Sequence, residues 1–488
     1  MLAFSLVVAS CAGKLGSPGA DGAAPTAGET PPPGGLAFGG LPIDELETLR
    51  LALVRPEDTT PARVSMTDQS AVIVADLLYD GLTEVVGRDG TLRPALATAW
   101  SADDDFTSWT FTLDGERIAA DAVVAHFEGL VDGEVSSATG QLVSSIESVE
   151  AIDAQTVAFT LDSPDAGFAW LMSGLPVSVV GPDGGQTGRF AVAADSDRSL
   201  RLVAETADND LRPAAVEVHW VASADDGYDL LTLGLADAAV APVERLADAR
   251  RRFGHEPVER SITVFYGVGL GDGDANRRRT VLAALDTADF DDEIALLGAA
   301  PTGGILPPAL AGSREPDWPA PDGEEVTATL GAADEVAISV GFTDEGHEPL
   351  AQAMANRLLD VGFDAVVDER DVAQQAAAIA DGRAGLFAFG WVAAAGSVDA
   401  VARPLLAGDS ATNVLGYRSD QIDDLLAVAA RTGSDEARWA LLAEAHELAL
   451  ADARAVPLGA AFSQLVVAPP AEGLVVRADG SLDLEPTE

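Results

Sequence analysis

Positive charge is scarce in this chain of 488 residues. It has 29 Lys and Arg residues against 79 Asp and Glu residues, which gives a formal net charge of -50 at pH 7. Lys14 is the only lysine. A chain this acidic repels the phosphates of nucleic acids and the headgroups of anionic lipids. The composition therefore excludes nucleic-acid binding as a function.

Cysteine and histidine are equally sparse. Cys11 is the only cysteine, which excludes an internal disulfide framework and a cysteine-based zinc site. The histidines are His126, His219, His255, His347 and His446. None of them has a partner at the spacing of metal ligands, and Leu450 stands where a zinc-protease motif starting at His446 needs its second histidine. We expect no metal site and no cofactor.

The motifs of several enzyme classes are also missing. No Gly-x-Ser-x-Gly sequence is present, so a serine nucleophile lacks its usual sequence support. The glycine-rich stretch 267–273 has neither dinucleotide-binding nor P-loop spacing. A calcium loop starting at Asp272 fails because Arg277 and Ala283 replace its required Gly and Glu. We therefore predict a protein that is not an enzyme.

The first residues form a short apolar run, too brief to span a bilayer, that ends in Val8-Ala9-Ser10-Cys11. This ending resembles a bacterial lipobox, so we interpret residues 1–11 as an export signal and Cys11 as the lipidation site. An incidental or buried thiol is the alternative. Residues 12–42 are rich in Gly and Pro and cannot bury enough apolar area to fold, which predicts a disordered tether. No second membrane span is expected.

Beyond the tether, the pattern is that of an α/β protein. Short β-branched runs alternate with Ala- and Leu-rich helical segments. A strand at 336–340, a helix at 347–361 and a strand at 365–368 predict a βαβ unit. Further strands are expected at 49–54, 109–113, 146–152 and 156–161, and further helices at 70–78, 121–130, 420–431 and 435–453.

Two blocks carry a more specific signal, Leu77-Leu78-Tyr79-Asp80-Gly81-Leu82-Thr83 and the segment Gly90 to Trp100. With Trp109 to Leu113 and Ala119 to Val123, which follow in order, they resemble the opening signature of extracellular solute-binding proteins of family 5. That family contains the dipeptide- and oligopeptide-binding lipoproteins of ABC importers. The resemblance covers about residues 43 to 488.

The resemblance implies a two-lobe periplasmic-binding-protein type II fold with a hinge. Lobe I would comprise 43–262 plus 463–488, with an inserted subdomain at about 76–169, and lobe II would comprise 263–462. The hinge crossings would lie near Ser261 to Tyr266 and near Phe462 to Val466. The implied function is that of a monomeric, lipid-anchored carrier outside the cytoplasm. It would capture a peptide or related small solute between the lobes for an ABC permease and its ATPase.

The resemblance also points to ligand-binding residues. Family members place the tryptophan that matches Trp391 at the interlobe pocket, although a core tryptophan is the alternative. Tyr266, Phe462 and Met66 are further candidates from hinge and pocket segments. Peptide-binding relatives carry an Asp three residues after the tryptophan to pair with the ligand's α-amino group, whereas this chain has Ala394. Asp399 is a candidate substitute.

This departure leaves alternatives for the function. The ligand is a different solute, such as a modified peptide, a nickel chelate or a sugar, or the chain is a lipoprotein with a degenerate pocket that acts in sensing or interaction. A cell-surface hydrolase would need a carboxylate pair deep in the cleft. A cleft filled by the protein's own side chains would favour the degenerate pocket.

Overall fold

The computed structural model describes residues 47–484, except 88–89, 134, 136, 205–212, 255–257, 270–274, 286, 317–336, 344 and 472–473. The predicted export signal with Cys11 and the tether at 12–42 lie outside the described residues. Among the helices described, none combines the length and apolar character needed to cross a membrane.

One half of the described chain is built on a six-stranded mixed sheet. β1, the strand expected at 49–54, lies inside it and pairs in parallel with β10 and β11. Its leucines, at every second position, are buried, as expected for a strand covered on its faces. In spatial order the strands are β18 (Leu465–Val467), β11 (Ala238–Val240), β1 (Thr48–Val54), β10 (Ala215–Val221), β9 (Ser199–Ala204) and β8 (Phe190–Asp195).

Three helices pack against this sheet. α1 begins after Asp68, whose carboxylate accepts hydrogen bonds from the N–H groups of Ser70 and Ala71 and thereby caps the helix. Its apolar face contributes Ile73 and Leu77 to the core of the sheet. The helices are α1 (Gln69–Leu78), α5 (Ala224–Thr232) and α6 (Val243–Phe253). Two hairpins complete this lobe, β2 (Thr83–Val86) with β3 (Thr91–Pro94), and β19 (Val475–Val476) with β20 (Leu482–Asp483).

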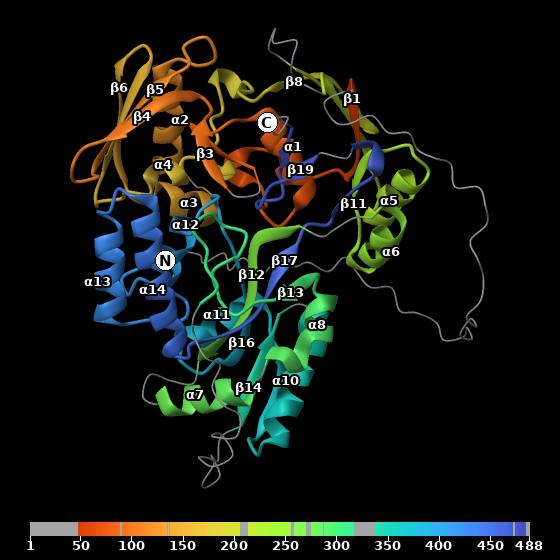
Figure 1. Cartoon of the computed structure of the whole chain (residues 1–488), viewed down its shortest axis with the longest axis vertical. Helices are drawn as coiled ribbons and strands as arrows, with labels where there is room; N and C mark the ends of the chain where they lie inside the picture. Colours follow the sequence, from red (N-terminus) through yellow and green to blue (C-terminus); the bar gives the residue numbers. More distant parts are fainter. Residues whose placement is uncertain are drawn as a thin grey trace.

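A separate four-stranded antiparallel sheet forms the inserted subdomain. Its core is aromatic, with the rings of Phe111, Phe127 and Phe159 packed at centroid distances of 5.0 to 5.5 Å. The strands and helices are β4 (Ala97–Ala102), β5 (Ser108–Leu113), β7 (Thr156–Leu161), β6 (Ile146–Asp153), α2 (Ala120–Asp132), α3 (Ser137–Val143) and α4 (Phe168–Leu171). Figure 1 shows this subdomain, in orange and yellow, above the blue helices of the other lobe.

The second lobe is built on another six-stranded sheet among the described residues. The predicted βαβ unit is confirmed, because β14 and β15 pair in parallel and α10 connects them. In spatial order the strands are β13 (Ala299–Pro301), β17 (Ala455–Phe462), β12 (Glu259–Gly269), β16 (Gly385–Val392), β14 (Ile338–Phe342) and β15 (Ala365–Glu369).

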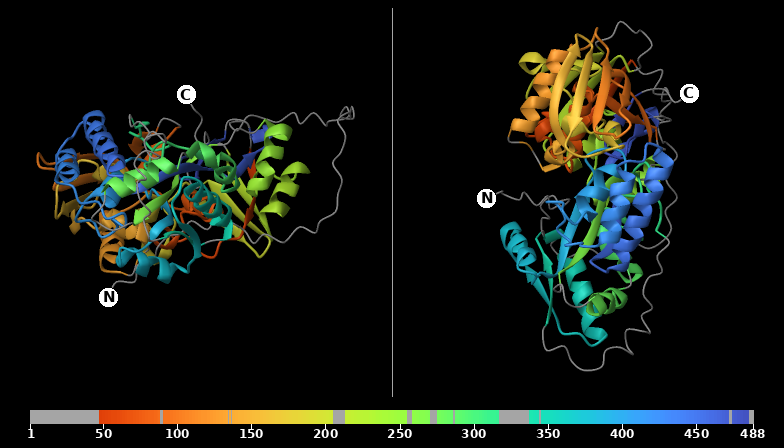
Figure 2. Two further views of the ribbon diagram at one scale, coloured as in Figure 1. Left: turned by 90° about the horizontal axis from the view of Figure 1, so that it is seen from below. Right: turned by 90° about the vertical axis from the view of Figure 1, so that its left-hand side faces the viewer.

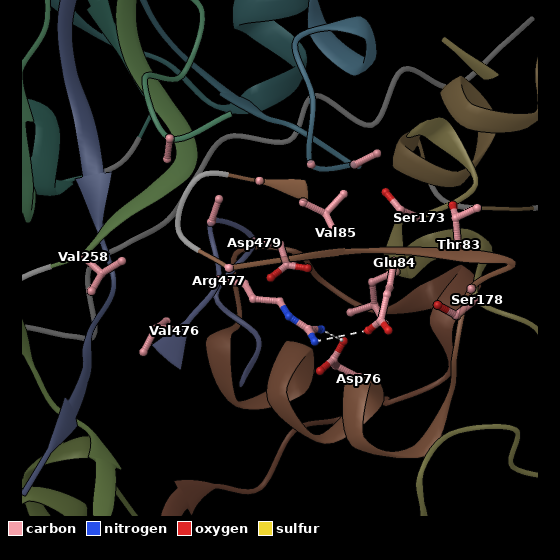
Figure 3. Close-up of a pocket in the computed structure, with 18 of the residues that line it drawn as sticks. Asp76, Thr83, Glu84, Val85, Ser173, Ser178, Val258, Val476, Arg477 and Asp479 are labelled. Carbon is pink, nitrogen blue, oxygen red and sulfur yellow. Dashed lines mark hydrogen bonds and ion pairs between the residues drawn. The ribbon is translucent and has the colours of Figure 1, made fainter. Parts of the chain in front are cut away.

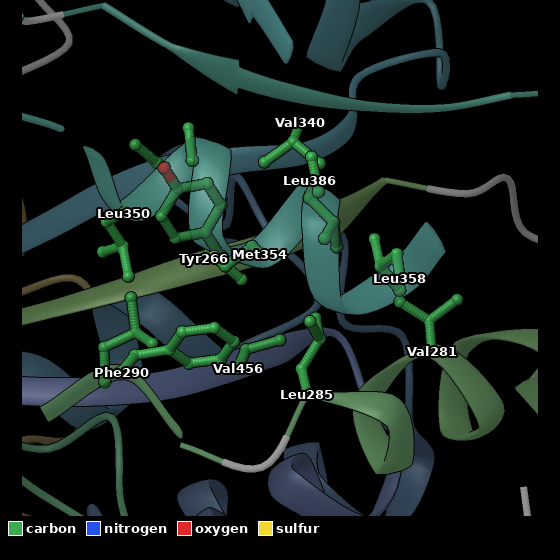
Figure 4. Packing of buried hydrophobic residues seen from close by; sticks show 14 of the residues in the cluster. Tyr266, Val281, Leu285, Phe290, Val340, Leu350, Met354, Leu358, Leu386 and Val456 are labelled. Atoms are coloured by element: carbon green, nitrogen blue, oxygen red, sulfur yellow. The ribbon is translucent and has the colours of Figure 1, made fainter. Parts of the chain in front are cut away.

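Helices cover this second sheet. The apolar face of α10 packs with Tyr266, Phe290 and Val456 in one core (Figure 4). A second core lies under α12, α13 and α14. These helices form the side of the second lobe that faces the inserted subdomain (Figures 1 and 2). The helices are α7 (Ala275–Ala284), α8 (Asp291–Leu296), α10 (Glu348–Asp360), α11 (Val372–Ala380), α12 (Asp399–Leu406), α13 (Asp420–Ala429) and α14 (Asp435–Ala451).

The chain passes between the two large sheets at two extended crossings. β17 ends at Phe462 in the second sheet and β18 starts at Leu465 in the first, within the crossing expected near Phe462 to Val466. The other crossing precedes β12, which starts at Glu259, so the segment Ser261 to Tyr266 lies inside the second sheet. The family resemblance thus places this crossing a few residues too late, because the continuous β12–β16 ladder already begins at Ile262.

Candidate functional site

The two lobes touch directly at Gly174 and Ala394. A Cβ atom on Gly174 would lie 2.4 Å from the carbonyl oxygen of Ala394 and 2.7 Å from Cδ1 of Leu142. Real Cβ atoms do not approach this closely, so only glycine allows the contact. Ala394 is 2% exposed and belongs to the same apolar cluster as Leu142 and Leu171 of the subdomain.

Two cavities flank this contact. The first, here the hinge cavity, has a volume of about 470 Å³. Ser173 and Leu175 line it from the first lobe, Ala395 and Gly396 line it from the second, and Phe462 stands at the crossing between them. A cavity with walls from both lobes and the hinge changes shape whenever the lobes rotate.

An arginine surrounded by carboxylates forms one wall of the hinge cavity. The guanidinium of Arg477 points toward Asp76 and Glu84, with N–O distances of 3.3 and 3.4 Å (Figure 3). Glu84 also receives a hydrogen bond at 2.8 Å from Arg189. Burial raises the pKa of Asp76 to about 7, although the neighbouring Arg477 opposes the shift. The wall therefore carries more carboxylates than cations, because Asp80, Glu259 and Asp479 line it as well.

The second cavity, here the subdomain cavity, has a volume of about 520 Å³. It lies between the inserted subdomain and the helical layer of the second lobe. Its lining is largely apolar, with Leu142 and Leu171 from the first lobe and Leu426, Ala429 and Leu442 from the second. Pockets of this size with apolar walls and a few polar groups are typical of small-molecule sites.

Asp399 and Arg438 form the most buried ion pair at this cavity. Arg438 Nε lies 2.7 Å from Asp399 Oδ1, and the two side chains are 1% and 7% exposed. Asp399 Oδ2 accepts hydrogen bonds from Ser397 Oγ, Arg438 Nη2 and Trp439 Nε1. Asp399 lines the cavity, and internal donors already bind both of its carboxylate oxygens. Its predicted contact with a ligand stays a prediction.

Asp165 lines the same cavity from the subdomain side. Its Oδ1 accepts a hydrogen bond from the N–H of Gly167 at 2.8 Å. Burial, and after it the negative charge of Asp399, raise the pKa of Asp165 to about 6. Arg438 and Arg403 oppose this shift only in part. The surroundings of Asp165 therefore disfavour its negatively charged form.

The other predicted ligand residues lie at different depths. Phe462 lines the hinge cavity, half-buried. Met66 is 6% exposed and packs with Leu175 and Val392 in a small apolar cluster between the lobes. Leu175 belongs to both surroundings, because it packs in the cluster of Met66 and lines the hinge cavity together with Phe462.

Trp391 and Tyr266 lie in the interior of the second lobe. Trp391 is 5% exposed and belongs to the core under α12, with Phe265 and Phe389 nearby. Tyr266 is fully buried among the side chains of α10 and β14 (Figure 4). Neither residue is part of the lining of the two cavities formed by the described residues. Ligand contact by Trp391 or Tyr266 stays a prediction, as does the alternative that Trp391 is a core residue.

Several cavity residues were not singled out from the sequence. Asp76 and Asp80 are four residues apart on and just beyond α1, a spacing that could have indicated two carboxylates on one face. Arg477 is 401 residues from Asp76 in the chain, so no local pattern connects them. Asp165 follows a strand in a polar loop, where a solvated carboxylate is the usual expectation.

Buried histidines do not form a metal site here. His446 is 2% exposed, and its Nε2 accepts a hydrogen bond from the N–H of Ile305 at 3.1 Å. Burial lowers its pKa to about 4, so the ring is neutral. In the part of the chain that the structure describes, no group of three or more His, Cys, Asp or Glu side chains could hold a metal ion.

Comparison with known proteins adds a family and a fold. Residues 91–413 match the family described as "Bacterial extracellular solute-binding proteins, family 5 Middle". The glutathione-binding protein GsiB of Escherichia coli K12 is 22% identical over 444 residues, which cover 82% of this chain and 86% of GsiB. The probable D,D-dipeptide-binding periplasmic protein DdpA of the same strain is 33% identical over 94 residues, only 18% of either chain.

Among solved structures, HbpA2 from Haemophilus parasuis superposes with a TM-score of 0.78 at 18% sequence identity. The superposition covers 90% of this chain and 99% of HbpA2. The two-lobe type II fold expected from the sequence is thereby confirmed.

Proposed function

The chain belongs to the bacterial extracellular solute-binding proteins of family 5, and from this premise we propose that it captures a small solute between its lobes for an ABC importer. A permease would receive the solute, and a separate ATPase would supply the energy. The observation that carries the proposal is the pair of cavities at the hinged lobe interface. Closure of two lobes about short extended crossings is a common way to enclose a ligand.

The class of solute is a peptide or a related compound. GsiB and DdpA are named for glutathione and D,D-dipeptides, which supports this class for their relative. An ordinary dipeptide fits less well, because Ala394 replaces the carboxylate that peptide-binding relatives place there and packs against Gly174. A ligand whose amino group is modified, or whose charged group is bound elsewhere, is consistent with this contact.

We also propose that Cys11 carries a lipid and that residues 12–42 tether the body outside the cytoplasmic membrane. The supporting feature is the Val8-Ala9-Ser10-Cys11 sequence ahead of a Gly/Pro-rich segment. Cys11→Ser should release the protein from membrane fractions. Retention of this variant in the membrane would contradict the anchor.

The first test of the solute-binding proposal is thermal denaturation in the presence of peptides, modified peptides, sugars and metal chelates. A ligand at 100 times its dissociation constant stabilises the folded state by about 2.7 kcal/mol, which raises the melting temperature measurably. A selective rise identifies the cargo class.

A second candidate function is a lipoprotein with a degenerate pocket that senses or binds another protein. The observation that favours it is the apolar cluster of Met66, Leu175 and Val392, which fills part of the space between the lobes. If no solute of the library raises the melting temperature, this candidate is favoured over a carrier.

A further inference from the structure

We propose that the subdomain cavity binds the cationic end of the solute, and that Asp165 pairs with the ammonium group of an apolar primary amine. This inference rests on the proposed solute-binding function and specifies its ligand. It assigns the charged contact to the inserted subdomain, on the opposite side of the interface from Ala394.

The backbone of the loop between β7 and α4 holds Asp165 in place. The N–H of Asp165 donates to the carbonyl of Phe106 at 2.9 Å, and its own carbonyl accepts from Trp109 Nε1 at 3.2 Å. Its Oδ1 accepts a hydrogen bond from the N–H of Gly167. Among the residues that the structure describes, no donor reaches Oδ2, so one carboxylate oxygen at the cavity has no internal partner.

The neighbouring cations do not neutralise this carboxylate. Arg438 is committed to Asp399 through two hydrogen bonds and to Asp435 at 2.7 Å. Arg403 is half exposed and lies 3.8 Å from Asp409. Asp165 is half-buried. A half-buried carboxylate beside another carboxylate gains more from a bound cation than a fully solvated one does, because each charge compensates the other's lost hydration.

Polar and charged residues such as Arg403, Asp409 and Thr412 also line the cavity, but one part of it suits an apolar body. Leu142 and Leu171 on the subdomain side face Leu426, Ala429 and Leu442 on the other, and all of them line the cavity. A ligand that pairs with Asp165 and fills this space therefore contacts both lobes at once. Since the contacts come from both lobes, such a ligand would favour the closed arrangement.

The test is a calorimetric titration of the full chain with 2-phenylethylamine and with 2-phenylethanol, which has the same shape without the charge. We expect the amine to bind at least tenfold more tightly than the alcohol. Asp165→Asn should remove this preference and leave the alcohol's affinity unchanged. Asp104→Asn is the matched control, because it removes the same charge from an exposed position of the same subdomain and should change neither affinity.

A second variant does not depend on the charge. Ala411 lies exposed at the rim of the cavity, so Ala411→Trp should block the amine and the alcohol alike while the protein stays folded. An amine affinity unchanged in Asp165→Asn, or equal affinities of amine and alcohol, would overturn the assignment. Loss of amine binding in Glu84→Gln but not in Asp165→Asn would move the cation to the hinge cavity and leave the carrier function standing. If neither the amines nor any solute of the library binds, the carrier function itself fails.

Discussion

Arg438 and Asp399 form a buried ion pair in the second lobe at the place where the inserted subdomain rests on it, with Nε 2.7 Å from Oδ1. Gly167 of the subdomain lies so close that a Cβ there would be 2.7 Å from this carboxylate oxygen. Trp170 of the subdomain packs edge-on against Trp439, with ring centroids 5.2 Å apart. The pair therefore supports the surface on which the first lobe and the second meet.

Asp399→Ala should destabilise the protein strongly, because it leaves the Arg438 guanidinium buried without its main partner. The expected loss in the free energy of unfolding is about 3 kcal/mol, at the low end for such pairs because Asp435 remains 2.7 Å away. Urea denaturation of this variant and of the control described next measures the loss. Asp381→Ala is the matched control, since its partner Arg383 is 78% exposed and the change should cost less than about 0.5 kcal/mol. Similar losses in the two variants would contradict this role.

Asp165 should make the protein less stable at neutral pH than at mildly acidic pH. Its pKa rises from 3.8 to about 6 on folding. Between these values the folded state binds more protons than the unfolded state, so this group's contribution to stability falls as the pH rises through about 6. Asp165→Asn should therefore be more stable than the parent by roughly 1–2 kcal/mol at pH 7.5 and equal to it at pH 4. Denaturation of both proteins at the two pH values measures the difference. A gain of the same size at both values would exclude titration of Asp165 as its cause.

His446 should make the protein less stable at acidic pH than at neutral pH, the opposite of the effect of Asp165. Its pKa falls from 6.5 to about 4 on folding because the ring is buried, while Nε2 accepts from Ile305 N. The unfolded state then binds the extra proton, so stability is lost as the pH falls from about 6.5 toward 4. His446→Gln should reduce this acid loss while costing about 1–3 kcal/mol at pH 7.5 from imperfect packing and hydrogen bonding. If the variant loses as much stability as the parent between pH 6.5 and pH 4, His446 is not the cause of that loss.

Gly174→Ala should disturb the contact between the lobes. The new Cβ would clash with the Ala394 carbonyl, which is backbone and cannot rotate away, so the lobes must separate or the loop must move. We expect a loss of about 1–3 kcal/mol in unfolding free energy and a larger radius of gyration in solution scattering. The matched control is Gly129→Ala in α2, where a Cβ would meet nothing within 4 Å and helix propensity favours alanine. Unchanged scattering in Gly174→Ala would show that this contact does not set the lobe arrangement.

Trp391 offers a test of its place in the core. Trp391→Ala should cost about 3–5 kcal/mol because it empties a large buried volume. Trp391→Phe should cost much less, since among the described residues no acceptor reaches the buried Nε1 of the indole. Chemical denaturation, with titration of any solute from the screen, separates stability from affinity. Weaker binding with little loss of stability in Trp391→Ala would return this residue to the pocket.

Local patterns predicted much of this fold. The helix over α1, the β6–β7 hairpin and the β14–α10–β15 unit all follow from spacing of apolar residues, which acts within one element. The cavities do not follow from such spacing. Arg477 meets Asp76 only because the C-terminal segment returns to the first lobe, and Trp391 was placed by family analogy although its strand is packed on both faces. Contacts between residues far apart in the chain determine both the Arg477–Asp76 pair and the burial of Trp391.

The central claim is that a solute binds between the lobes and draws them together. Cys11 is the only cysteine, so a Cys11→Ser background with Val192→Cys on β8 and Leu359→Cys on α10 allows one spin label on each lobe at an exposed position. The distance between the labels, measured by double electron–electron resonance, should shift to a shorter and narrower distribution when a solute from the screen is added. A solute that binds tightly and leaves the distribution unchanged would contradict capture by lobe closure.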